Sequence, residues 1–164
     1  MSGPDILKKE EIPSFEELLS DLSDDDVETL GQFLERAEYV PGETIFYESD
    51  PSESLYVIQV GSVEISKMSD QEGEEYVPLV QLDEGNIFGE LSFLTDSPRS
   101  ASAVASTHVV LYKLSKQDFN TIVEDYPDLG CKVYDAILNV LAYRLRRTDK
   151  KLVDLSEQLE SDAP

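Results

Sequence analysis

The sequence predicts a mainly β fold, a sandwich or a rolled barrel, with helices at both ends of the chain. Short segments of alternating apolar and polar residues recur through its middle, turn residues separate them, and helical patterns flank them. With 164 residues, 40% of them hydrophobic and 29% charged, the chain is long enough for one domain with a real core and an appended helix.

Two helices are predicted before the first strand, because two serines are each followed three residues later by an acid. This is the pattern of a capping box. Ser14 begins a helix over 14–21, and Ser23 begins one over 24–36. The residues before them, 1–12, are expected to form a disordered tail. They are polar and charged, so they do not form a secretory signal.

Strands are predicted between the helices wherever the pattern has a period of two. Their ranges are 43–46, 54–59, 62–67, 75–82, 101–106 and 108–114. A single helical turn over 90–94 interrupts them.

Two further helices are predicted at the C-terminal end. Ser115 caps the first, which ends near Val123, and Pro127 begins the second, which continues to Leu159. Residues of the second helix recur in alternating steps of three and four: Leu138, Leu141, Leu145, Thr148, Leu152, Leu155 and Leu159. This heptad pattern predicts a parallel homodimer. An amphipathic helix lying on its own barrel would show the same residues over a shorter length.

Charge and rare residues exclude several classes of function. The formal net charge of -22 argues against a broad surface for nucleic acid or anionic lipid, and no apolar run is long enough to cross a bilayer. Cys131 is the only cysteine and His108 the only histidine. We therefore expect no internal disulfide, no metal site and no enzyme. Cys131 is expected in a buried apolar position, in a protein of a reducing compartment such as the cytoplasm.

One cation stands out in this acidic chain. Arg99 is the only Lys or Arg between Lys67 and Lys113. Its guanidinium can bind two oxygens of a phosphate, and the hydroxyl of Ser100 can donate to the same group.

The residues around it favour a small anionic ligand. Gly89 lets the backbone approach closely, and the free N–H groups of the following turn favour an anion. Glu90 can only accept hydrogen bonds, so it suits a sugar hydroxyl, and a sugar beside a phosphate indicates a nucleotide. The alternative is an ordinary surface ion pair of Arg99 with Glu90 or Asp96.

The segment 88–103, with its Gly-Glu and Arg-Ser pairs, resembles the phosphate-binding cassette of cyclic nucleotide-binding domains. That module occurs in bacterial catabolite activators, cyclic-nucleotide-dependent kinases and cyclic-nucleotide-gated channels. The resemblance covers about residues 13–155 and includes Pro41-Gly42 and the pattern from Leu55 to Val63. It departs from the family pattern at Ser49 and Ser52, where glycine is usual, and at Phe93, where a smaller aliphatic residue is usual.

The resemblance implies an eight-stranded jelly roll (a double-stranded β-helix) with flanking helices over 13–126, a dimerisation or lid helix over 127–159, and a tail over 160–164. It also implies that a cyclic nucleotide contacts Phe88, Gly89, Glu90, Leu91, Arg99, Ser100, Ala101 and Thr148.

The implied function is that of a dimeric cyclic nucleotide sensor that acts on an unknown partner. We expect cAMP to be favoured over cGMP, because Thr148 can accept from the amino group of adenine while Ile65 and Leu79 lie against the base. Ser100 can instead reach the amino group of guanine, which would reverse the preference. Two alternatives remain: a ligand-free dimerising scaffold, and a fragment of a transcription regulator that lacks its DNA-binding domain. The basic run over 144–151 is expected to be a solvated face.

Overall fold

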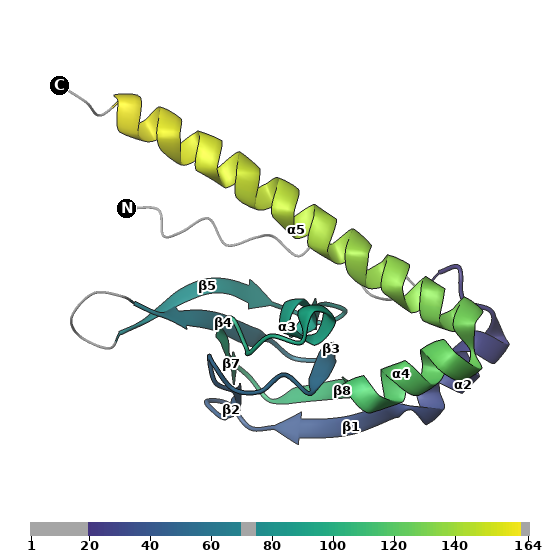
Figure 1. Ribbon diagram of the computed structural model, residues 1–164. Coiled ribbons are helices and arrows are strands. Elements are labelled where there is room, and N and C mark those ends of the chain that lie inside the picture. Colours follow the sequence, from purple (N-terminus) through teal and green to yellow (C-terminus); the bar gives the residue numbers. More distant parts are fainter. Residues whose placement is uncertain (1–19, 70–74, 162–164) are drawn as a thin grey trace.

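The computed structural model describes residues 20–69 and 75–161, in which two four-stranded antiparallel sheets form a barrel flanked by helices (Figure 1). The sheet orders are β1-β8-β3-β6 and β2-β7-β4-β5. The strands are β1 (Leu34–Tyr39), β2 (Thr44–Phe46), β3 (Ser54–Val60), β4 (Val63–Met68), β5 (Tyr76–Leu82), β6 (Ile87–Phe88), β7 (Ser102–Ala105) and β8 (Val109–Ser115). The helices are α2 (Asp24–Gln32), α3 (Glu90–Thr95), α4 (Lys116–Asp125) and α5 (Pro127–Ser161). The predicted jelly roll is confirmed.

Two hydrophobic clusters hold this architecture together. The first fills the barrel and draws on both sheets, for example Ile58 and Leu111 from one and Val63 and Ala103 from the other. The second lies between the first sheet and the helices. Because successive side chains of a strand point to opposite faces, Leu55 of β3 packs in the second cluster while Tyr56 and Ile58 pack in the first. The first sheet is therefore covered on both faces.

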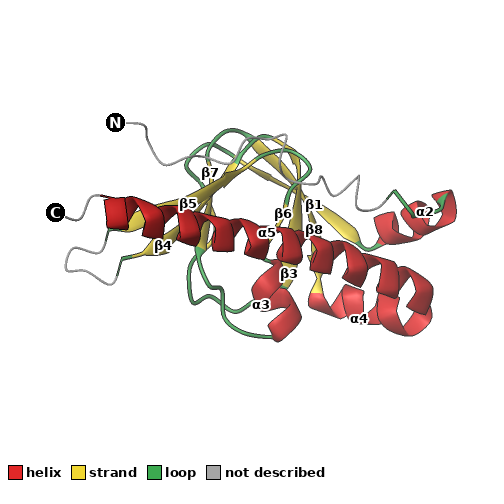
Figure 2. Ribbon diagram, turned by 90° about the horizontal axis from the view of Figure 1, so that it is seen from above, coloured by secondary structure: helices red, strands yellow, loops and turns green. Residues whose placement is uncertain are grey.

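The long helix α5 has two halves with different surroundings. Its first half packs on the second cluster through a stripe at helical spacing: Leu129, Val133, Ala136, Ile137 and Val140. Its second half extends away from the barrel (Figure 1) and, seen from above, crosses to the β4–β5 side (Figure 2). Most of the predicted heptad leucines are exposed along the outer side of α5, from 54% at Leu138 in its first half to 74% at Leu159 near its end. Leu141 instead packs against the second cluster.

No helix among residues 20–69 and 75–161 combines the length and the apolar character that a membrane span requires.

Local sequence signals located most elements correctly. Ser23 and Ser115 cap α2 and α4 as predicted, with their hydroxyls accepting from Asp26 N at 3.1 Å and Asp118 N at 3.0 Å. All six predicted strands are present, each within a residue or so of its predicted ends. The predicted helix over 14–21 and the tail over 1–12 fall outside the described residues, except that residues 20 and 21 form a turn.

The predicted helix over 24–36 is too long. It ends at Gln32, and Leu34 begins β1, which pairs with β8 from Leu34–Leu114 to Tyr39–Val109. The charged residues of β1 have good helical propensity, but pairing along the whole strand outweighs a weak local preference. The two-residue strand β6 was also not predicted; its register with β3 is set by the fold.

The prediction that Cys131 is buried is wrong, because its side chain is exposed. Cys131 lies seven residues before Leu138 on α5, and both residues face away from the barrel.

Ser49 adopts a left-handed backbone conformation in the turn between β2 and β3, with φ of 72°. This turn is tied to the cassette, since Ser49 N donates to Arg99 O and Arg99 N donates to Asp50 O, both at 2.8 Å. A side chain in this conformation costs about 1–2 kcal/mol relative to the right-handed region.

We predict that Ser49→Gly raises the free energy of unfolding by about 1 kcal/mol, because glycine adopts a positive φ without this strain. Urea denaturation followed by circular dichroism measures the change. Ser52→Gly is the matched control in the same turn; Ser52 has no positive φ, so its replacement should give no gain. Equal effects of the two substitutions would contradict the prediction.

Candidate functional site

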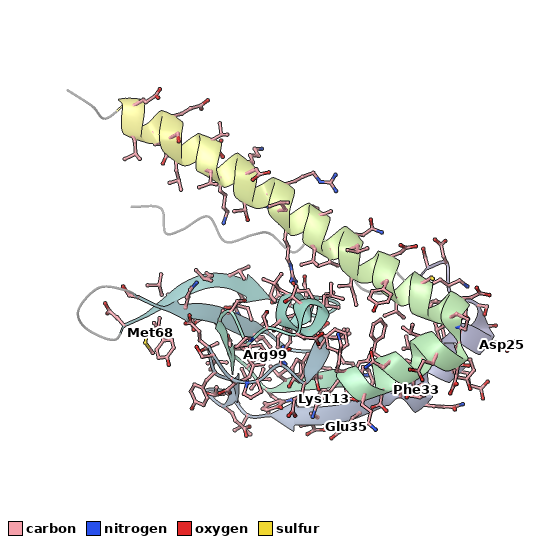
Figure 3. The ribbon with its side chains drawn as sticks, viewed as in Figure 1. Asp25, Phe33, Glu35, Met68, Arg99 and Lys113 are labelled. Carbon is pink, nitrogen blue, oxygen red and sulfur yellow. The ribbon has the colours of Figure 1, made fainter. Side chains whose placement is uncertain are left out.

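The guanidinium of Arg99 is buried inside the barrel, below α3 (Figure 3), and the side chain is only 4% exposed. Nη1 donates to Gly89 O at 2.9 Å and to Ser92 Oγ at 3.3 Å, and Nη2 donates to Ser54 O at 2.6 Å. Burial lowers the pKa of Arg99 from its ordinary value, but an arginine remains charged at neutral pH. A buried cation is therefore held by uncharged acceptors.

One nitrogen of this guanidinium has no acceptor among the described residues. Nε of Arg99 is buried and makes no hydrogen bond to any described residue. An unpaired buried donor is costly, so the position suits an acceptor from outside the chain. The surface ion pair considered above is excluded: Asp96 pairs with Lys116 at 3.2 Å, and Glu90 pairs with a different arginine.

Gly89 allows this close packing. Its φ is 75°, and a Cβ at this position would lie 2.6 Å from Nη1 of Arg99. Only glycine both adopts this positive φ without strain and leaves room for the arginine, because it has no Cβ. The chain then enters α3, whose C-terminal end is held by Lys116, with Nζ donating to Phe93 O at 2.8 Å. The larger side chain of Phe93 is accommodated in the second cluster, where its ring lies 5.4 Å from that of Phe119.

Glu90 is the second buried charge of the site. Its side chain is 8% exposed, and Oε1 accepts from Nη1 of Arg144, which lies on α5. Nη2 of Arg144 donates to the carbonyl of Ile87, just before the cassette. A carboxylate has lone pairs on both oxygens, so Oε2 of Glu90 remains able to accept from a hydroxyl. Arg144 therefore neutralises Glu90 without using all of its acceptor capacity.

A pocket of about 200 Å³ lies between β5 and α5. Its lining consists of Leu79, Val80 and Leu82 from β5 and Tyr143, Arg144, Arg147, Thr148 and Lys151 from α5. Thr148 Oγ1 donates to Arg144 O at 3.0 Å, which leaves its lone pairs free to accept. Of the two strand residues expected to lie against the base, Leu79 lines this pocket, whereas Ile65 is not part of the lining and packs against the barrel core.

The structure brings together some of the predicted site residues and separates others. Gly89, Glu90 and Arg99 are in direct contact or adjacent. Phe88 points into the core, where its ring stacks on Tyr56 at 5.1 Å. The other three predicted residues of the cassette lie at different depths: Leu91 and Ser100 are exposed, and Ala101 is buried. Thr148 is on α5, in the pocket lining.

Sequence reasoning missed Arg144, Ser54 and Ser92. Ser54 contributes a backbone carbonyl, which no sequence pattern reveals. Arg144 had a signal that was not used. It lies four residues before Thr148, so the two share one face of the helix.

Comparisons with known proteins agree with this geometry. The family model described as "Cyclic nucleotide-binding domain" matches residues 36–126. A CRP-like cAMP-activated global transcriptional regulator of Mycobacterium tuberculosis is 32% identical over 129 residues, which are 79% of this chain and 55% of that protein. A cAMP-dependent protein kinase regulatory subunit of Hypocrea atroviridis is 33% identical over 114 residues, 70% of this chain and 22% of that protein.

Solved structures show the same fold. The crystal structure of a cyclic nucleotide-binding domain from Methylobacillus flagellatus matches with a TM-score of 0.78 at 28% identity, covering 85% of this chain and 83% of that one. This chain thus spans about half the length of the mycobacterial relative and a smaller part of the kinase subunit.

We predict that Arg144→Met lowers the free energy of unfolding by about 1–2 kcal/mol, because it leaves the carboxylate of Glu90 buried without its cation. Chemical denaturation at neutral pH provides the measurement. Arg146→Met, on the exposed side of the same turn, should change stability by less than about 0.5 kcal/mol. Adding Glu90→Gln to Arg144→Met should recover part of the loss, and no recovery would argue against the ion pair as its cause.

Proposed function

Because the chain belongs to the cyclic nucleotide-binding domain family, we propose that it is a sensor whose ligand spans from Arg99 to the pocket between β5 and α5. The cyclic phosphate lies at Arg99, the ribose at Glu90 and the purine against Leu79 and Thr148. The observation that carries this proposal is the buried Nε of Arg99, a charged donor without an acceptor among the described residues. A phosphate oxygen satisfies it with a charge-assisted hydrogen bond.

The order of the groups along the site supports the proposal that the ligand is a nucleotide. Arg99 contacts Gly89, Glu90 follows directly and contacts Arg144, and Arg144 lines the pocket. A cation, an acceptor-rich carboxylate and a mainly apolar pocket thus follow one another, as do phosphate, sugar and base in a nucleotide. Exposed Ser100 and Leu91, at the surface of the cassette, complete the proposed contacts together with the backbone around Gly89 and Ala101.

We further propose that the outer stripe of α5 binds the same stripe of a second copy. Leu138, Leu145, Leu152 and Leu159 are each more than half exposed and recur every seven residues. A stripe with this spacing is complementary to itself in a parallel coiled coil. Dimerisation would place the two ligand sites on either side of one helix pair, so that a ligand with different contacts in two positions of α5 could act as a switch.

The response to the ligand passes to a partner that remains to be identified. The named relatives are a transcriptional regulator and a kinase regulatory subunit, and both are longer than this chain.

We predict that the wild-type protein binds cAMP or cGMP at micromolar concentration or below, and that Arg99→Ala weakens binding by about 2–4 kcal/mol. Arg99→Lys is the matched variant: it keeps the charge but not the two-pronged geometry, so its loss should be intermediate. Isothermal titration calorimetry measures the affinity of the wild type and of the two variants. Neither heat nor a thermal shift for the wild type at millimolar cyclic nucleotide would show that the sensor proposal is wrong.

We predict that glutamate at both Leu145 and Leu152 converts the dimer to monomers, because unpaired charges would be buried in the seam. Sedimentation velocity at about tens of micromolar, where weak assemblies form, is the measurement.

Cys131 provides a test of whether the two helices run parallel. It lies one heptad before Leu138, so it meets its own copy only in a parallel pair.

Diamide, which takes up the two electrons and two protons of a thiol pair, should therefore link the wild-type protein into a disulfide dimer and leave the double variant unlinked. A monomeric wild type, or a dimer that diamide does not link, would contradict the parallel seam.

We predict that cAMP binds more tightly than cGMP and that Thr148→Val weakens cAMP binding by about 1 kcal/mol, the value of one neutral hydrogen bond. The substitution keeps the shape of the side chain and removes the acceptor. Ser100→Ala is the contrasting variant in the same titrations. If it selectively weakens cGMP, and the wild type prefers cGMP, the assignment of the base is reversed.

A further inference from the structure

The guanidinium of Arg99 lies on aromatic rings that the proposed ligand contacts do not use. Its Cζ is 4.2 Å from the centroid of the Phe46 ring and 5.6 Å from that of Tyr56. The rings form a group of their own, with Phe46 5.8 Å from Tyr56 and 5.9 Å from Phe88. A guanidinium over a ring face is attracted by the negative face of the π-system, most strongly where both are shielded from water.

The backbone of β2 is shaped to bring Phe46 to this position. Thr44 pairs with Val104 and Phe46 with Ala103, so one extra residue, Ile45, lies between two consecutive partners. In a regular strand, Ile45 and Phe46 would point to opposite faces. The bulge lets both pack against the barrel core, with the Phe46 ring under Arg99.

The ring and the hydrogen bonds restrain the guanidinium in different directions. The carbonyls of Gly89 and Ser54 and the hydroxyl of Ser92 accept from Nη1 and Nη2 at its edge. The ring of Phe46 contacts its face. With the edge and one face both restrained, Nε is held in one direction, and it has no acceptor among the described residues.

We propose that Phe46 is a positioning residue that holds the Arg99 guanidinium in the orientation in which Nε receives the ligand's phosphate. The benefit for binding rests on the proposed function, because only a phosphate at Nε would gain from a preorganised donor. The orientation of Arg99 itself does not depend on any ligand. A purely space-filling role for Phe46 makes a different prediction, since leucine or methionine would then serve as well as phenylalanine.

The first arm of the test uses the ligand-free protein. In a ¹⁵N-labelled sample, the Nε–H resonance of Arg99, assigned by its loss in Arg99→Lys, should be sharp in the wild type and in Phe46→Tyr, which keeps the ring. In Phe46→Leu and Phe46→Met, the resonance should shift and broaden because the ring no longer restrains the group. Phe33→Leu is the matched control, since Phe33 lies at the α2–α4 end of the molecule (Figure 3) and contacts Tyr126.

The second arm compares cAMP with adenosine, which has the base and sugar but no phosphate. Phe46→Leu and Phe46→Met should each weaken cAMP binding by about tenfold. They should leave adenosine binding unchanged, and Phe46→Tyr should retain wild-type affinity for cAMP. A general disturbance of the barrel would instead weaken both ligands together, and it would also reduce the dispersion of the amide spectrum.

The two arms separate the two proposals. An unchanged Nε–H resonance in both Phe46→Leu and Phe46→Met overturns the positioning role, as does equal weakening of cAMP and adenosine. If the wild type binds no cyclic nucleotide, the proposed function fails and the resonance alone decides whether Phe46 orients Arg99. A shifted resonance together with a cAMP-specific loss supports both.

Discussion

The guanidinium of Arg99 is buried in a chain whose formal net charge is -22, and the geometry of the site follows from keeping this cation satisfied. Burying a charge costs several kcal/mol unless hydrogen bonds replace its water. The start of β3 supplies the carbonyl of Ser54, and the cassette supplies the carbonyl of Gly89. Gly89 must remain glycine because a Cβ would meet Nη1, and the strained turn at Ser49 is tied to the backbone of Arg99. Strand, turn and cassette therefore form one unit.

A second arginine connects this unit to the long helix. Arg144 reaches from α5 to the carboxylate of Glu90 and to the carbonyl of Ile87, on the two sides of Gly89. The first half of α5 is held by apolar packing, whereas its second half has an exposed leucine stripe. Arg144 lies close to the transition between the two. A displacement of α3 would reach α5 through this ion pair and through the packing of Phe93 on Phe119.

Local chemistry explains which predictions succeeded. A serine cap accepts from one of the unpaired N–H groups at a helix start, an interaction that needs only neighbouring residues, so α2 and α4 begin where predicted. Alternating residues identified strands because successive side chains of a strand point to opposite faces of the sheet. The cassette was recognisable because its glycine, acid and arginine occur close together in the chain. Helix 24–36 was predicted too long because nothing local shows that β8 lies beside Leu34.

The sequence by itself determined the fold class, most of the element starts, the cassette residues and the seven-residue stripe of α5, since each depends on neighbours within a few residues. The starts of β1 and β6 were exceptions. Only the tertiary structure decided that Arg99 is buried on Phe46, that Glu90 pairs with Arg144, and that Cys131 is exposed. Each of these depends on contacts between segments about 50 residues apart, or on which face of a helix meets the barrel. Burial and pairing are properties of the packed chain, and the free energy that selects them is summed over the whole fold.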